Sequence, residues 1–450
     1  MSLSAALGDL LPAWLPRPGP LFNPLISPPE ALPPAAQLAG PMGLLIFVPL
    51  IPLVLLAGRW QPRAALVVSG LAWLLLTARP TAALVLLGGV AAATGWLLLL
   101  ARLRRREHLN RRGMIALVWL GLHALILPLW WWAQQPWYLP LSPMAALHTL
   151  GFAYFLLRYI AWGVALADDP RQPLRPVETL CWIVYPPCMR LGPVLLREQF
   201  LGRLAVWDPR RSPNFWAGAA RFGMCLVGAV SLGAVLKNIP PVLRDLPADD
   251  ALATGAATGA LDFFAAPQLY ATGELLRVFY LVPIEVYLLL WTYNQLALAA
   301  SLWIGIPVDN NFNYVPLATS VRDFWRRWHV TVGAWLRTYM YIPLGGNRRH
   351  VTLNYILVFG YCGIWHGASW SFLAWGLSQA VALVVQRWWD TLRDRLGWPA
   401  RPRHALAAAA WTAMCWLVTM HYQLATVVMF TDFEHLGLRL FRELLGRFSA

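Results

Sequence analysis

Long apolar segments recur along most of this chain and constrain its fold more than any other feature. A helix needs about 20 residues to cross the ~30 Å hydrocarbon core of a bilayer. Apolar windows occupy residues 42–58, 64–78, 81–101, 114–134, 144–167, 218–236, 272–304, 352–372, 373–386 and 405–430. They are continuous rather than alternating, which argues against a membrane β-barrel. The pattern predicts an all-α, polytopic membrane protein with about ten or eleven transmembrane helices.

The distribution of charge predicts how these helices are oriented. The net charge is +15, but the arginines are concentrated in short connections such as 102–112, 208–216 and 386–404, so we expect no nucleic-acid partner. Short basic loops remain in the cytoplasm. The loop 238–271 carries more acidic than basic residues and is expected outside, as is the amino terminus. A lipid bilayer is the predicted environment of these helices.

One membrane domain is expected, over residues 42–430. The proline-rich segment 1–41 is predicted to be an irregular leader, and 431–450 an amphipathic tail. Two zones, 178–200 and 307–350, interrupt the apolar pattern with proline, glycine and polar residues. Broken backbone at membrane depth is tolerated where protein or a cavity satisfies its polar groups. We therefore expect re-entrant or interfacial segments there. The five cysteines follow no metal-binding or disulfide spacing and are expected to be free.

A histidine stands in the apolar motif GYCGIWHGASW. On a helix, Gly360, Gly363 and Gly367 share a face, and Gly363 with Gly367 would let another helix approach closely. His366 lies about 100° from that face, next to Trp365 and with Ser369 one turn later. The histidine could simply form a hydrogen bond with a neighbouring helix. Ionisable groups inside a membrane are costly, however, and usually face a cavity or a substrate path.

A second histidine follows a basic, aromatic stretch, RDFWRRWHVTVGAWLR. At helical spacing, Trp325, Trp328, Val332 and Trp335 share one face, and Arg322, Arg326 and His329 a neighbouring one. Such a helix could simply lie on the cytoplasmic leaflet. Gly345 and Gly346 then permit a left-handed turn at the helix end. That turn would leave three polar residues free to meet phosphate: Asn347, Arg348 and Arg349.

Neutral imidazole can accept a proton from a hydroxyl and return it to a leaving group. No G-x-S-x-G elbow or Cys–His nucleophile pattern accompanies these histidines. Direct attack by a hydroxyl substrate is therefore favoured over a covalent acyl-enzyme, although Cys362, one turn before His366, leaves the covalent route open.

Four stretches of this sequence resemble the membrane-bound O-acyltransferase (MBOAT) family. They read YPPCMRLGPVLLREQF, LLLWTYNQLALAASLWIGIPVDNNFNYVP, VRDFWRRWHVTVGAWLRTYMYIPLGG and GIWHGASWSFLAWG. The likeness is to the bacterial branch that acetylates alginate and other exported polysaccharides. The chain departs from that branch at Thr338, where aspartate is usual, and at Gln379, where histidine is frequent.

The resemblance implies a ring of helices around a central tunnel, with an acyl donor entering from the cytoplasm and an acceptor from outside. It implies that His366 is the catalytic histidine and His329 the second histidine. We also expect a set of residues to bind the donor or line the tunnel: Trp365, Ser369, Trp328, Arg326, Arg327, Arg337, Asn311, Asn313, Tyr293, Asn294, Arg348 and Arg349. Arg158 and Glu285 are intramembrane charges that should face the interior, in an ion pair or near substrate.

The predicted function is transfer of an acyl group, with acetyl favoured, to a hydroxyl of an exported glycan. No bound cofactor or metal is expected. The donor would be acetyl-CoA or a carrier-protein thioester, and an extracytoplasmic relay protein could receive the group. One alternative is transfer of D-alanyl or another acyl group from a carrier protein to a cell-envelope polymer. Another is a transporter with a histidine proton relay, which would predict repeated halves that the sequence lacks.

Overall fold

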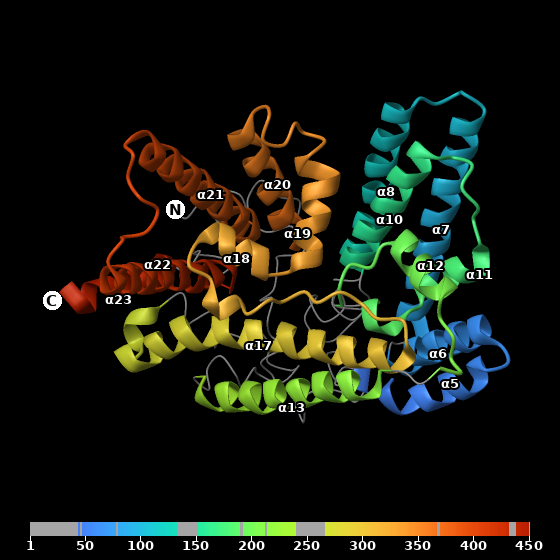
Figure 1. The fold of residues 1–450 in the computed structure, drawn as a ribbon, viewed down its shortest axis with the longest axis horizontal. Coiled ribbons are helices and arrows are strands. Elements are labelled where there is room, and N and C mark those ends of the chain that lie inside the picture. Colours follow the sequence, from blue (N-terminus) through green and yellow to red (C-terminus); the bar gives the residue numbers. More distant parts are fainter. Residues whose placement is uncertain are drawn as a thin grey trace. The chain divides into compact units, whose positions relative to one another are not determined.

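The computed structural model describes residues 44–45, 47–77, 80–132, 152–189, 192–211, 214–239, 266–366, 370–431 and 438–449. Within these ranges the chain is helical and contains no strand, which confirms the predicted all-α class (Figure 1). The leader 1–41, most of the acidic loop and the region 133–151 lie outside the described residues. The chain forms two compact units. Unit 1 takes its described residues from Ala234–Val286 and Asn313–Ala450, and unit 2 from Pro29–Gly233 and Tyr287–Phe312.

The predicted apolar windows coincide with helices. They are α5 (Ile51–Gly58), α6 (Pro62–Thr77), α7 (Pro80–Arg105), α8 (Arg111–Trp132), α10 (Phe152–Asp168), α13 (Phe215–Asn238), α17 (Thr272–Ile304), α20 (Val351–His366), α21 (Trp370–Arg395) and α22 (Ala405–Thr431). By length and composition alone, three stretches of the described part could each cross a membrane: Leu86–Arg105, Phe215–Asn238 and Thr272–Ile304.

In unit 2, α7, α8 and α10 pack side by side (Figure 1). Small residues bring them together. A Cβ placed on Gly121 of α8 would come within 2.3 Å of the indole nitrogen of Trp96 on α7. That indole donates a hydrogen bond to the carbonyl of Leu117 at 3.2 Å. Small residues let apolar helices approach closely in a membrane, where van der Waals packing drives their association.

In the first predicted interruption, 178–200, the helical structure is broken, as expected. It contains α11 (Pro176–Ile183), a single 3₁₀ turn at Pro186–Cys188 and the start of α12 (Arg197–Ala205). Arg158 of α10 is buried and donates to the carbonyls of Trp182 and Cys188. Its guanidinium also lies 4.4 Å from the centre of the Trp182 ring. Arg158 therefore satisfies interrupted backbone. No carboxylate contacts it among the described residues, so the structure does not show the ion pair considered for Arg158.

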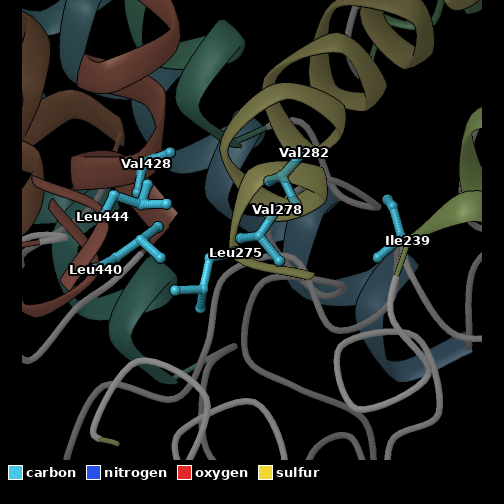
Figure 2. Packing of buried hydrophobic residues seen from close by; sticks show 7 residues of the cluster. All are labelled: Ile239, Leu275, Val278, Val282, Val428, Leu440 and Leu444. Atoms are coloured by element: carbon cyan, nitrogen blue, oxygen red, sulfur yellow. The ribbon is translucent and has the colours of Figure 1, made fainter. Parts of the chain in front are cut away.

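Unit 1 contains α18 (Val321–Arg327), α19 (Val330–Leu336), the hairpin of α20 and α21, α22, and α23 (Leu438–Ser449). The first part of α17 anchors a hydrophobic cluster in this unit. Figure 2 shows its members, which come from α17, α22 and α23 and from the residue after α13: Ile239, Leu275, Val278, Val282, Val428, Leu440 and Leu444. This packing fixes α23, the described part of the predicted tail, against the unit.

The second interruption differs from our prediction in one respect. The stretch from Arg322 to Arg337 is not one amphipathic helix, because α18 ends at Arg327 and α19 begins at Val330. Trp328 is extended and His329 adopts a left-handed conformation with φ 45°. Both predicted faces were therefore wrong, the apolar one of Trp325, Trp328, Val332 and Trp335 and the polar one of Arg322, Arg326 and His329. Helical spacing cannot be carried through a residue with positive φ.

Candidate functional site

His366 is the last residue of α20. Glycine determines how α20 meets α21. A Cβ on Gly363 would come within 2.2 Å of the Phe372 carbonyl oxygen, and one on Gly376 within 2.2 Å of the Phe359 oxygen. The close approach predicted at Gly363 is thus confirmed, with α21 as the partner helix (Figure 1). Gly367 and Ser369 lie outside the described residues.

Aromatic rings surround the half-buried imidazole of His366. The ring centres of Trp365, Trp375 and Phe372 lie 4.8, 5.2 and 6.3 Å from it. Trp375 meets the imidazole edge-on, with 89° between the planes. Aromatic rings prefer edge-to-face and offset packing, so these neighbours restrict how the imidazole can turn. The arrangement suits a polar group that must meet one substrate atom in an otherwise apolar setting.

His329 occupies the break between α18 and α19. A non-glycine residue in the left-handed region costs about 1–2 kcal/mol, and such strain concentrates at functional sites. The break is held by backbone hydrogen bonds, from the Trp328 amide to the Phe324 carbonyl and from the Gly333 amide to the His329 carbonyl. The side chain is buried, and its ring lies 5.7 Å from that of Trp328. His329 lies outside the apolar windows, and burial lowers its pKa to about 4. The imidazole is therefore neutral at pH 7.

The two histidine motifs share one aromatic cluster in unit 1. Trp325 of α18 packs against Trp375 at 6.0 Å between ring centres, and Trp375 in turn packs against His366. Trp325 also contacts Phe359 of α20, at 4.9 Å. Trp375 thus stands between the α18 segment that leads to His329 and the imidazole of His366.

The arginines predicted to bind a donor fall into two groups. Arg326, Arg337, Arg348 and Arg349 are exposed. Arg327 is instead engaged within the protein, because it forms an ion pair with Asp323 at 3.0 Å and donates to the Asn313 carbonyl at 3.2 Å. The structure gives Arg327 a role in holding the backbone at Asn313. Arg348 and Arg349 follow Gly345 and Gly346, whose φ angles of 108° and 54° confirm the predicted left-handed turn.

The predicted tunnel residues Tyr293, Asn294 and Asn311 are buried in unit 2. Asn294 organises the asparagine-rich turn that follows α17. Its amide nitrogen donates to the Asn310 side chain at 2.7 Å, and its oxygen accepts from the Asn311 backbone at 3.3 Å. The structure therefore shows Asn294 stabilising the turn.

Sequence reasoning missed a buried amide network beside the aromatic cluster. It consists of Gln379 on α21 with Gln423 and Thr426 on α22. A signal for it was present, since Gln423 and Thr426 are polar residues three positions apart in an apolar helix. Their partner could not be identified, because the faces of α21 and α22 that meet are set by tertiary packing.

The sequence profile described as MBOAT, membrane-bound O-acyltransferase family, matches residues 107–431. This match covers most of the chain, which therefore belongs to that family of membrane acyltransferases.

Several curated relatives are similar to parts of the chain. A peptidoglycan O-acetyltransferase of Helicobacter pylori is 47% identical over 98 residues, which are 21% of this chain and 19% of that protein. A probable alginate O-acetylase AlgI of Azotobacter vinelandii is 29% identical over 258 residues, 55% of this chain and 46% of the relative. A teichoic acid D-alanyltransferase of Streptococcus thermophilus is 30% identical over 260 residues, 54% and 58% of the two chains. The similarity spans from a fifth to somewhat more than half of these relatives.

Proposed function

We propose that this protein transfers an acetyl group from a cytoplasmic donor to a hydroxyl of an exported cell-envelope or extracellular polysaccharide. One observation carries the proposal. His366 is a half-buried imidazole that ends α20 inside three aromatic rings, in a chain of the MBOAT family. The names of its relatives, which are acyltransferases of alginate, peptidoglycan and teichoic acid, support a polymer as acceptor.

In the proposed reaction, a ring nitrogen of His366 accepts the proton of the acceptor hydroxyl. The hydroxyl oxygen attacks the thioester carbonyl, and a tetrahedral oxyanion forms. When the C–S bond breaks, the imidazolium returns the proton to the leaving thiolate, so the products are an ester and a thiol. General acid–base catalysis of this kind contributes about 10²–10⁴ in rate. His329, buried and neutral, is proposed to orient a substrate or to donate a hydrogen bond to developing charge.

The proposed setting is a bacterial cytoplasmic membrane. There, residues 42–430 would form one domain of ten or eleven helices around a tunnel open to both sides. The donor would be acetyl-CoA or a carrier-protein thioester, and the exposed arginines 326, 337, 348 and 349 would meet its phosphates. The acceptor would be the glycan itself or a relay protein outside the membrane. Short arginine-rich connections support the cytoplasmic assignment of that face.

D-alanyl transfer to a cell-envelope polymer is the second candidate, supported by the similarity to teichoic acid D-alanyltransferases. Both candidates use the same imidazole chemistry but differ in the acyl group delivered. A transporter that uses the histidines as proton carriers would instead transfer no acyl group.

The test is to express the wild type, His366→Ala and His404→Ala with the native envelope glycan. Mild alkali releases ester-linked acyl groups, and mass spectrometry identifies the released acid. His404 is exposed before α22 and is the matched control. We expect acetate from the wild type and from His404→Ala, and none from folded His366→Ala. Release of D-alanine instead of acetate would identify D-alanyl as the transferred group. Equal amounts of acid released from the glycan with all three proteins would refute the catalytic role of His366.

A further inference from the structure

A buried set of side-chain hydrogen bonds joins α21 to α22. Gln379 and Gln423 pair through their amides, with nitrogen–oxygen distances of 3.2 and 3.3 Å in the two directions. The Gln379 nitrogen also donates to the Thr426 hydroxyl at 3.0 Å. Gln379 has no exposed surface, and Gln423 and Thr426 are buried with it. These bonds fix the orientation of the Gln379 amide, because both partners of its nitrogen lie on α22.

The fixed amide presents its oxygen to α18. The indole nitrogen of Trp325 donates to Gln379 Oε1 at 3.1 Å. An indole has one donor and no acceptor. Reversing the Gln379 amide would set its N–H groups against the indole N–H, while Gln423 and Thr426 would lose a donor. The network therefore holds Trp325 in one rotamer, and Trp325 packs against Trp375.

We infer that Gln379 is a positioning residue for His366, acting through Trp325 and Trp375. The inference rests on the proposed function and adds a residue to it. Gln379 lies one helical turn after Trp375 on α21, and the Trp375 ring meets the imidazole edge-on at 5.2 Å. Without the amide, the Trp325 indole loses its acceptor, and the hydrogen bond no longer fixes the packing of Trp325 against Trp375, whose ring forms one wall around the imidazole.

A purely structural role for the network predicts a different result. In that case the hydrogen bonds between α21 and α22 would do no more than hold the two helices together. Loss of such a connection lowers stability and the amount of folded protein, but each folded molecule retains the activity of the wild type. Loss of positioning instead lowers kcat per folded molecule, because displacement of a catalytic group by about 1 Å can cost 10²-fold.

The experiment compares Gln379→Leu, which keeps the bulk and removes both polar groups, with Gln379→His, which keeps one acceptor and one donor. Trp325→Phe removes the indole donor together with part of the ring that packs against Trp375 and Phe359. Thr419→Val is the control, because Thr419 is a buried polar residue of α22 outside the network. Purified folded protein is assayed for kcat and for the KM of acetyl-CoA. The rate of diethyl pyrocarbonate modification at His366, followed by peptide mass spectrometry, reports on the imidazole without requiring transfer.

We expect Gln379→Leu and Trp325→Phe each to lower kcat about 10- to 100-fold while KM changes less than about threefold. The double variant should be no slower than the worse single variant, because both remove one interaction. Gln379→His should recover most of kcat, and Thr419→Val should match the wild type. The modification rate at His366 should change in the two impaired variants only.

Wild-type kcat and wild-type modification of His366 in folded Gln379→Leu would overturn the inference, as would losses that multiply in the double variant. If Gln379→Leu does not fold, Trp325→Phe and Gln379→His carry the same test. A wild type that transfers no acyl group would overturn the proposed function alone, and the modification rates would still decide the positioning role.

Discussion

Replacing Gly363 by alanine tests whether the α20–α21 hairpin sets the position of His366. The added Cβ would lie 2.2 Å from the Phe372 carbonyl oxygen and 3.2 Å from the Cα of Leu373. Real Cβ contacts are essentially never closer than 3.0 Å, and backbone atoms cannot rotate away. The helices must therefore separate, and each loses contacts along the hairpin.

Two opposing terms give the magnitude. Alanine favours a helix interior over glycine by about 1 kcal/mol. Overpacking a close contact costs about 1–3 kcal/mol, occasionally more. Because the obstacle at Gly363 is backbone, we take the upper end of that range and expect a net loss of about 2 kcal/mol in the free energy of unfolding. His366 lies three residues further along α20, so the same displacement should also reduce kcat.

Gly360→Ala is the matched control on the same helix. Its Cβ would lie 3.7 Å from the nearest atom, the end of the Leu377 side chain, which is ordinary contact. Gly360→Ala should therefore raise the free energy of unfolding by up to about 1 kcal/mol, the difference in helix propensity between alanine and glycine. Gly376→Ala, with a Cβ 2.2 Å from the Phe359 oxygen, should behave like Gly363→Ala. The assay is thermal unfolding of detergent-purified protein followed by tryptophan fluorescence, with kcat measured in parallel. Equal unfolding midpoints for Gly363→Ala and Gly360→Ala would refute the reasoning.

Two further substitutions, Arg158→Met and His329→Gln, test buried polar groups. Arg158→Met should lower the free energy of unfolding by at least about 2 kcal/mol, since buried carbonyls lose a charged donor and the cation–π contact with Trp182 is lost. Arg63→Met, which removes an exposed ion pair with Glu178, should change it by less than about 1 kcal/mol in the same unfolding assay. Burial lowers the His329 pKa to about 4, so the unfolded chain binds the proton first and stability falls as pH drops from about 6.5 towards 4. The acid sensitivity is measured as the difference in unfolding free energy between pH 7 and pH 4.5, and His329→Gln should reduce this difference by up to about 3 kcal/mol. An unchanged difference would contradict the lowered pKa of His329.

The sequence by itself determined the features that depend on residues close together along the chain. Apolar windows became helices because a long apolar segment must satisfy its own backbone. The interruptions around Pro186 and Gly345 were visible because proline and glycine act on local φ and ψ. The histidine motifs and their resemblance to a family were likewise present in short stretches of chain. The sequence also predicted a close helix contact at Gly363, because small residues permit one wherever a partner is available.

Tertiary structure alone decided which partners meet. It places Phe372 and Gly376 against Gly363 of α20, Trp375 against His366, and Gln379 against Trp325 and α22. It also breaks the helix at His329, where spacing alone predicted continuity, and engages Arg327 with Asp323 and Asn313. The reason is physical. Helical periodicity states which residues share a face, but the free energy that selects the facing helix, or that holds a residue at positive φ, comes from contacts between segments distant in the chain.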